Sequence, residues 1–105
     1  MNESEYQIKQ LSDELPIPES GKQSVVLTDN AKTKVILFSF AAGAGLTEHV
    51  APFDATIQII SGTALLTVGT ESVDGKPGTW IQMTAKTPHS IKAESNVVML
   101  LTMVK

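Results

Sequence analysis

The residues of this chain best suited to chemistry are its only two histidines, His49 and His89. A neutral imidazole offers a lone pair to a metal ion or a hydrogen-bond donor, and it exchanges protons near neutral pH. If the fold brings the two rings together, they could bind a metal ion, hold a substrate, or act as an acid and a base. The plain alternative is that each is a hydrogen-bonded polar group without a chemical role. The chain has no cysteine, which excludes disulfides, iron–sulfur clusters and thiol nucleophiles.

Length and charge narrow the classes of function. A chain of 105 residues forms one domain, since pieces of half that length usually need disulfides or metals to fold. All eight basic residues are lysine, and the formal net charge is −3. Proteins that bind nucleic acid use arginine forks and a positive surface, so we expect no nucleic-acid partner. Five acids against one lysine mark residues 1–20 as an acidic lead-in segment, and we assign the single domain to residues 21–105.

The beginning of the sequence carries no sign of a targeting signal. Residues 1–5 are acidic, whereas a secretory signal begins with basic and then apolar residues. The longest uncharged run, residues 55–70, contains Gln58 and two glycines and is shorter than the roughly 18–20 apolar residues of a membrane helix. We therefore expect a soluble, cytoplasmic protein with no membrane partner.

The residue composition favours strands over helices. Valine, isoleucine and threonine make up 28 of the 105 residues, and no window shows the apolar spacing of a long helix. Turn residues recur at short intervals, which is typical of a β-sandwich or a β-barrel. We interpret Asp54, Glu71 and Asp74 as turn residues. The pattern predicts one short helical turn within residues 6–15 and strands at residues 24–28, 33–40, 56–60, 63–68, 79–84, 90–93 and 97–104.

Two of the predicted strands have apolar residues on both faces, at Val35–Phe38 and at Val97–Leu101. A strand that is buried on both sides needs a cover on its outer face. In a small all-β chain this cover is a second sheet or another subunit, so we predict a homodimer. The alternative is an apolar edge without a partner, which would favour aggregation. Trp80, the only tryptophan, fits either the core or a dimer contact.

Two stretches together resemble the sequence motifs of the cupins. Within residues 43–62, Gly43 and His49 have the spacing of the first motif. Further along the chain, the pair Pro88-His89 resembles the second motif, which contributes one more histidine. The resemblance implies an all-β jelly-roll barrel, the cupin double-stranded β-helix. It also implies a divalent metal ion inside the barrel, held by three histidines and one glutamate.

The sequence departs from that metal motif at two positions. Ala51 stands where the motif has its second histidine, and Ala55 stands where it has its glutamate. The ligands that the resemblance carries over are therefore His49 and His89 alone, whereas a firm transition-metal site usually has three or four protein ligands. We expect at most a divalent ion such as Zn, Ni, Fe or Mn at low occupancy. Strand parity turns Gln58 outward, away from these ligands.

Three functions are compatible with the sequence. The first is binding of a small organic molecule in an apolar barrel, with the two histidines orienting its polar end. The second is a metal-dependent enzyme, an oxygenase or isomerase, with the same histidines as ligands. The third is a structural or regulatory dimer without a ligand, because cupins host many unrelated activities. The residues that we predict to line the pocket are His49, His89, Ala51, Ala55, Phe53, Ile57 and Met99.

Overall fold

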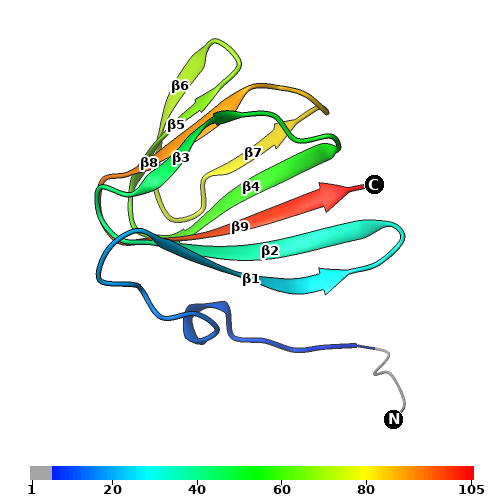
Figure 1. Ribbon diagram of the computed structural model, residues 1–105, viewed down its shortest axis with the longest axis horizontal. Helices are drawn as coiled ribbons and strands as arrows, with labels where there is room; N and C mark the ends of the chain where they lie inside the picture. Colours follow the sequence, from blue (N-terminus) through cyan, green and yellow to red (C-terminus); the bar gives the residue numbers. More distant parts are fainter. Residues whose placement is uncertain (1–5) are drawn as a thin grey trace.

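In a computed structural model, which describes residues 6–105, the chain folds into two antiparallel β-sheets that face each other (Figure 1). The five-stranded sheet has the order β1-β2-β9-β4-β7, and the four-stranded sheet has the order β3-β8-β5-β6. The all-β jelly-roll barrel predicted from the sequence is confirmed. The elements are the 3-10 helix η1 (Leu11–Asp13) and the strands β1 (Lys22–Asp29), β2 (Thr33–Phe40), β3 (Gly45–His49), β4 (Asp54–Ser61), β5 (Ala64–Val68), β6 (Glu71–Gly75), β7 (Trp80–Met83), β8 (His89–Ala93) and β9 (Val97–Val104).

The strands agree with the sequence prediction except at two places. β2 and β9 have the predicted bounds, and the other five predicted strands differ by one or two residues. β3 and β6 were not predicted, and the interpretation of three acids as turn residues was wrong. Asp54 is the first residue of β4. Glu71 and Asp74 lie on β6, where they pair with Val68 and Leu65 of β5. β6 is an edge strand with an exposed polar side, so its sequence lacks the apolar alternation by which a strand is recognised.

The core lies between the two sheets. Side chains alternate along a strand, so every second residue of β4 and β9 faces inward. A fully buried side chain of the size of isoleucine or phenylalanine contributes about 1.5–3 kcal/mol to folding. The buried core consists of Phe40, Ala55, Ile57, Ile59, Ala64, Leu66, Met83, Ile91, Ala93, Val97 and Met99.

The N-terminal segment covers part of the outer face of the five-stranded sheet. Leu37 and Ser39 of β2 point outward, and yet both are fully buried. The Ser39 hydroxyl donates a hydrogen bond of 2.9 Å to the carbonyl oxygen of Pro16, and η1 lies against β4. For this part of the face, the cover that the sequence assigned to a second sheet or another subunit is supplied by residues 6–20 of the chain itself, drawn in blue in Figure 1. The homodimer itself stays a prediction.

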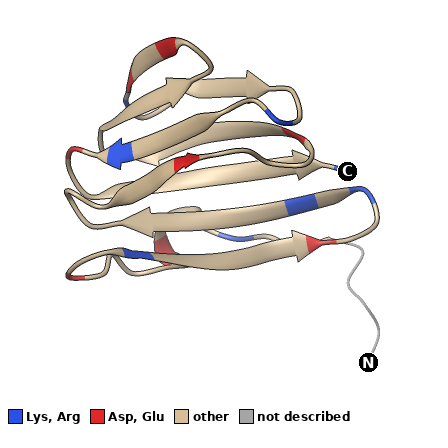
Figure 2. Cartoon of the chain, turned by 45° about the horizontal axis from the view of Figure 1, so that its top comes forward, with Lys and Arg blue, Asp and Glu red and all other residues tan. Residues whose placement is uncertain are grey.

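The remaining outer face of this sheet is more open. Trp80 on β7 is 59% exposed and lies opposite Gln58 of β4, so of its two predicted environments the core is excluded, and a dimer contact stays a prediction. Gln58 points outward, as strand parity predicted. Over the described residues, lysines and acids lie dispersed on loops and strand ends, and neither sign forms a continuous stripe (Figure 2). Residues 6–105 contain no helix that is long and apolar enough to cross a membrane.

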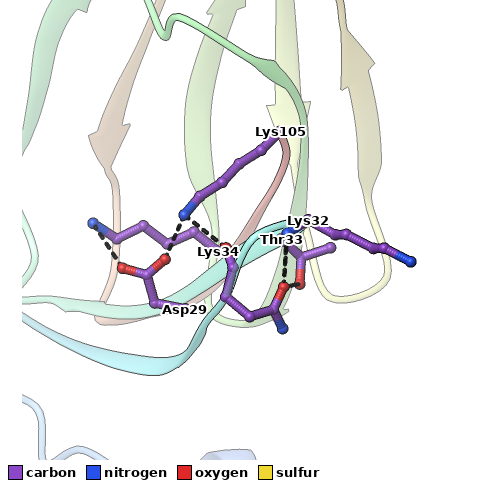
Figure 3. Close-up of polar contacts among 6 residues, drawn as sticks. Asp29, Lys32, Thr33, Lys34 and Lys105 are labelled. Atoms are coloured by element: carbon purple, nitrogen blue, oxygen red, sulfur yellow. Dashed lines mark hydrogen bonds and ion pairs between the residues drawn. The ribbon is translucent and has the colours of Figure 1, made fainter.

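The C-terminus ties down the turn between β1 and β2 (Figure 3). The Lys105 ammonium group donates to a carboxylate oxygen of Asp29 at 2.6 Å and to the backbone oxygen of Asn30 at 2.9 Å. β4 begins at Asp54, which pairs with Val104. Residues 50–53 connect the end of β3 to this start of β4. The contacts of Lys105 with Asp29 and Asn30 therefore lie at the same end of the barrel as the end of β3.

Candidate functional site

The two histidines meet across the ladder between β3 and β8. His49 is the last residue of β3, His89 is the first residue of β8, and the two are register partners. Their ring centroids lie 4.1 Å apart, with the ring planes tilted by 57°. His89 is buried at 5% exposure, whereas His49 is exposed at the rim. The two rings therefore form one site, with one member inside the barrel and one at its mouth.

Each ring is held by the same local contact. Nδ1 of His49 lies 2.7 Å from the carbonyl oxygen of Thr47, and Nδ1 of His89 lies 2.9 Å from that of Thr87. A carbonyl oxygen can only accept a hydrogen bond, so Nδ1 carries the proton in both rings. In the neutral ring, Nε2 then keeps its lone pair, and the orientation of the ring is fixed. The pair offers two Nε2 atoms as hydrogen-bond acceptors or metal ligands.

A glycine brings the strand that carries His49 close to β8. A Cβ atom at Gly45 would lie 2.0 Å from the carbonyl oxygen of Ile91, which is far inside van der Waals contact. The register of β3 on β8 then shifts between Leu46 and His49. Gly45 thus lets the strand approach, and the irregularity after Leu46 sets which residue faces His89.

A small cavity lies beside the two rings, between the two sheets. Its volume is about 10 Å³, which is room for about one water molecule. Most of its lining is aliphatic, and the imidazoles are its main polar groups. It is lined by Leu46, His49, Ile57, His89, Ser90, Ile91, Met99 and Leu101.

Four of the residues predicted for the pocket line this cavity, namely His49, Ile57, His89 and Met99. The other four lining residues were not predicted from the sequence, although two of them could have been recognised from their spacing. Ile91 and Leu101 each lie two positions after a predicted residue on the same strand, and residues two apart share a face. Leu46 and Ser90 carried no comparable signal.

The structure places the other three predicted pocket residues outside the lining. Ala55 is 2% exposed and packs in the core between its register partners Met83 and Met103, whose side chains fill the space beside it. Ala51 and Phe53 lie half-buried in the connection between β3 and β4. The carbonyl oxygen of Ala51 accepts a hydrogen bond of 2.8 Å from the backbone N–H of Lys86, which joins this connection to the turn after β7.

The carboxylates near the site point elsewhere. Oδ1 of Asp54 accepts a hydrogen bond of 2.9 Å from the backbone N–H of Ala85, so this side chain caps a turn. Glu48, beside His49, is exposed. Among residues 6–105, no three His, Cys, Asp or Glu side chains form a group that could hold a metal ion. The cavity is therefore lined without a negative charge from the described residues.

A larger and more open hollow lies on the four-stranded sheet. Its volume is about 400 Å³, and its lining includes hydroxyls of Thr67 and Ser90, which are hydrogen-bonded to each other. Leu65 and Lys92 border it and are exposed. Neither histidine lines this hollow, but Leu46, Ser90 and Ile91 line both the hollow and the cavity beside the rings.

Comparisons with known proteins agree with this architecture. The family profile described as a cupin domain matches residues 36–105. A conserved protein of unknown function from Streptococcus pyogenes is 30% identical with a TM-score of 0.86, over 100% of this chain and 92% of that chain. A cupin 2 conserved barrel domain protein from Leptotrichia buccalis is 28% identical with a TM-score of 0.83, over 90% of this chain and 46% of that chain.

A third solved structure is more distant in sequence. A cupin superfamily protein from Desulfitobacterium hafniense is 24% identical with a TM-score of 0.84, over 97% of this chain and 93% of that chain. At this identity the likeness shows the fold alone. No curated protein gives a match.

Proposed function

We propose that the barrel of this chain, which belongs to the cupin family, binds a small organic molecule. In this proposal, His49 and His89 hold the polar end of the ligand. The observation that supports this most is the pairing of the rings, 4.1 Å apart, with both Nδ1 atoms occupied by backbone carbonyls. Both neutral rings therefore present an acceptor. A ligand with an O–H or N–H donor, such as an alcohol, a phenol or an amide, matches these acceptors.

The wall of the cavity suits an apolar ligand body. Ile57, Met99 and Leu101 are aliphatic or thioether side chains, and a thioether adapts to irregular shapes. In its present conformation the cavity of about 10 Å³ holds about one water molecule, so an organic ligand enters only when lining side chains move. His49 lies at the exposed rim, and the unbranched side chain of Met99 has three rotatable bonds, so a change of rotamer at these two lining residues would enlarge the cavity.

A metal-dependent oxygenase or isomerase is less well supported. Cupin resemblance implies a divalent ion held by three histidines and one glutamate, and the donors present do not fit that ion. Ala51 and Ala55 cannot ligate, and the nearest carboxylate, that of Asp54, is hydrogen-bonded to the Ala85 backbone. We derive no reaction step through such an ion. The third function, a structural dimer without a ligand, stays a prediction.

A fragment screen by NMR tests the proposal. The probes are mixtures of small alcohols, phenols and amides, and the signals followed are the imidazole Cε1–H resonances of His49 and His89. We expect at least one fragment to shift both imidazole signals together with the backbone amides of Met99 and Leu101. Binding should also raise the midpoint of thermal unfolding, because the ligand binds the folded state alone.

Two variants supply the comparison. His49→Ala removes one of the two acceptors and should weaken the fragment by about two- to tenfold, since a hydrogen bond is worth about 0.5–1.5 kcal/mol net. Val50→Ala changes an exposed neighbour that does not line the cavity and should leave binding unchanged. The proposal is wrong if no fragment moves the imidazole signals, or if His49→Ala binds as well as the unaltered chain.

A further inference from the structure

The hollow on the outer face of the four-stranded sheet takes no part in the proposed function. Two neighbouring strands form its floor, because Thr67 of β5 is the register partner of Ser90 on β8, and Leu65 is that of Lys92. The residues between them on each strand are buried in the core, so these four side chains point outward. All four line the hollow, and they bring two hydroxyls, an ammonium group and an aliphatic side chain to one face of the sheet.

Residues of β3 and of the turn before it form the remaining wall of the hollow. Gly45 is the second register partner of Lys92, and Gly43 lies two residues before it. Both glycines line the hollow, and neither has a side chain that could fill it. The wall continues with Thr47 and Glu48, which are exposed. The volume of about 400 Å³ lies within the range of about 300–1,000 Å³ that is typical of small-molecule sites.

Two opposite charges and a hydroxyl donor border this space. Lys92 is exposed on β8, Glu48 is exposed on β3, and the ion pairs among residues 6–105 involve neither of them. The hydroxyls of Thr67 and Ser90 are hydrogen-bonded to each other. One O–H is used in that bond, so the other O–H remains as a donor. The hollow therefore offers a ligand one cation, one anion and one hydroxyl donor.

From this arrangement we propose that the hollow binds a free α-amino acid with an aliphatic side chain. The carboxylate of the ligand accepts hydrogen bonds from the Lys92 ammonium group and the remaining hydroxyl, and its ammonium group donates to the Glu48 carboxylate. The aliphatic side chain of the ligand lies on Leu65, which is 40% exposed. Covering Leu65 removes apolar surface from water, which favours binding.

Charge separates this ligand from simpler ones. A carboxylate without an ammonium group is attracted by Lys92 but repelled by Glu48, and for an amine without a carboxylate the reverse holds. An uncharged molecule interacts with neither charge. Exposed charges contribute little each, because water and salt screen them. We therefore expect an affinity in the millimolar range and a preference that depends on both charges.

This inference does not rest on the organic ligand that we propose for the barrel interior. The hollow and the histidine cavity share the lining residues Leu46, Ser90 and Ile91, whereas Leu65 and Thr67 line the hollow alone. The backbone amide signals of Leu65 and Thr67 therefore report on the hollow, and the imidazole signals report on the cavity. Either proposal can fail while the other stands.

An NMR titration tests the amino-acid site. Full-length, ¹⁵N-labelled protein is titrated with L-leucine, and the backbone amide signals of Leu65, Thr67 and Lys92 are followed. We expect these signals to shift and to reach saturation. Two analogues each lack one charge of leucine, since isocaproate has no ammonium group and isoamylamine has no carboxylate. Each analogue should bind about two- to fivefold more weakly than leucine, the factor that corresponds to one exposed ion pair.

Charge variants of the protein complete the test. Lys92→Gln and Glu48→Gln each remove one charge and should weaken leucine by the same factor. Lys92→Gln should no longer distinguish leucine from isoamylamine, and Glu48→Gln should no longer distinguish leucine from isocaproate. Lys22→Gln and Glu71→Gln are the matched controls, since both residues are exposed and neither lines the hollow. Shifts that do not saturate, or an unchanged affinity for leucine in either Lys92→Gln or Glu48→Gln, would overturn the proposal.

Discussion

His49 and His89 face each other as register partners at the end of the β3–β8 ladder, with ring centroids 4.1 Å apart. Each ring is held by the backbone carbonyl two residues before it. The pair is therefore a consequence of strand pairing and does not require a third side chain to orient it. Residues that alter this ladder should change the site without touching either ring.

Gly45→Ala should disturb the site from a distance. The added Cβ would lie 2.0 Å from the carbonyl oxygen of Ile91, so β3 has to move away from β8. Overpacking of this kind costs about 1–3 kcal/mol of unfolding free energy, measured by urea denaturation. The imidazole signal of His49 should shift as well. Thr47→Ala, an exposed change on the same strand, should change neither the unfolding free energy nor the imidazole signal of His49. Equal changes of these two quantities in both variants would contradict the role of Gly45.

Ser39→Ala should loosen the lead-in segment. It removes the hydrogen bond from the buried Ser39 hydroxyl to the carbonyl oxygen of Pro16. The expected loss is about 0.5–1.5 kcal/mol of unfolding free energy in urea, the net value of one such bond. Backbone amides of residues 14–18 should exchange with solvent faster. Ser72→Ala, on the exposed side of β6, is the control, and a comparable loss there would show that the bond to Pro16 is not the cause.

Removal of residues 1–20 should uncover the outer face around Leu37 and Val98, which is buried in the full chain. Exposed apolar strands favour association, so the shortened chain should be less stable and should form larger species than the full chain. Light scattering coupled to size exclusion measures both chains. The molar mass of the full chain in the same experiment tests the predicted homodimer. A shortened chain with unchanged stability and mass would show that the lead-in is not the functional cover of this face.

The Asp29–Lys105 pair predicts a pH dependence. The hydrogen bond from the Lys105 ammonium holds the pKa of the Asp29 carboxyl below its ordinary value, with Lys34 adding to the effect (Figure 3). A carboxyl with a lowered folded-state pKa contributes stability above its unfolded-state pKa, and this contribution is lost as the pH falls through the folded-state value. Because the pair is exposed, the contribution is small.

Two lysine variants measure this effect. In ¹³C NMR titrations, Lys105→Gln should raise the pKa of Asp29 toward its ordinary value. Lys34→Gln should raise it less, because its nitrogen lies 4.0 Å from the carboxylate against 2.6 Å for Lys105. An unchanged pKa of Asp29 in Lys105→Gln would contradict the assignment.

The fold could be predicted because the residue types of its central strands favour β-structure by themselves. Thr33–Phe40 and Val97–Val104 consist mostly of β-branched and apolar residues, and the structure gives them the predicted bounds. β3 contains a glycine, a glutamate and a histidine, and it forms because β8 pairs with it along an edge of the sheet. Such tertiary pairing is not visible in local propensity.

The site was only partly predictable for the same reason. Motif spacing indicated that His49 and His89 belong together, but it gave no information on the Nδ1 contacts or on how small the cavity is. Ala55 was predicted to line the pocket, whereas it is buried in the core between Met83 and Met103 of the neighbouring strands. The topology of the sheet decides which strands flank a residue. The burial of Ala55 could therefore not be predicted from its own position in the sequence.

The most direct test of the account is the protonation state of the two rings. Long-range ¹H–¹⁵N correlation spectra of the imidazoles, recorded where the rings are neutral, distinguish a proton on Nδ1 from a proton on Nε2. The account predicts Nδ1–H in both His49 and His89, with Nε2 unprotonated and its chemical shift responsive to bound fragments. A proton on Nε2 of either ring would leave only one acceptor or ligand nitrogen and would contradict the site as described.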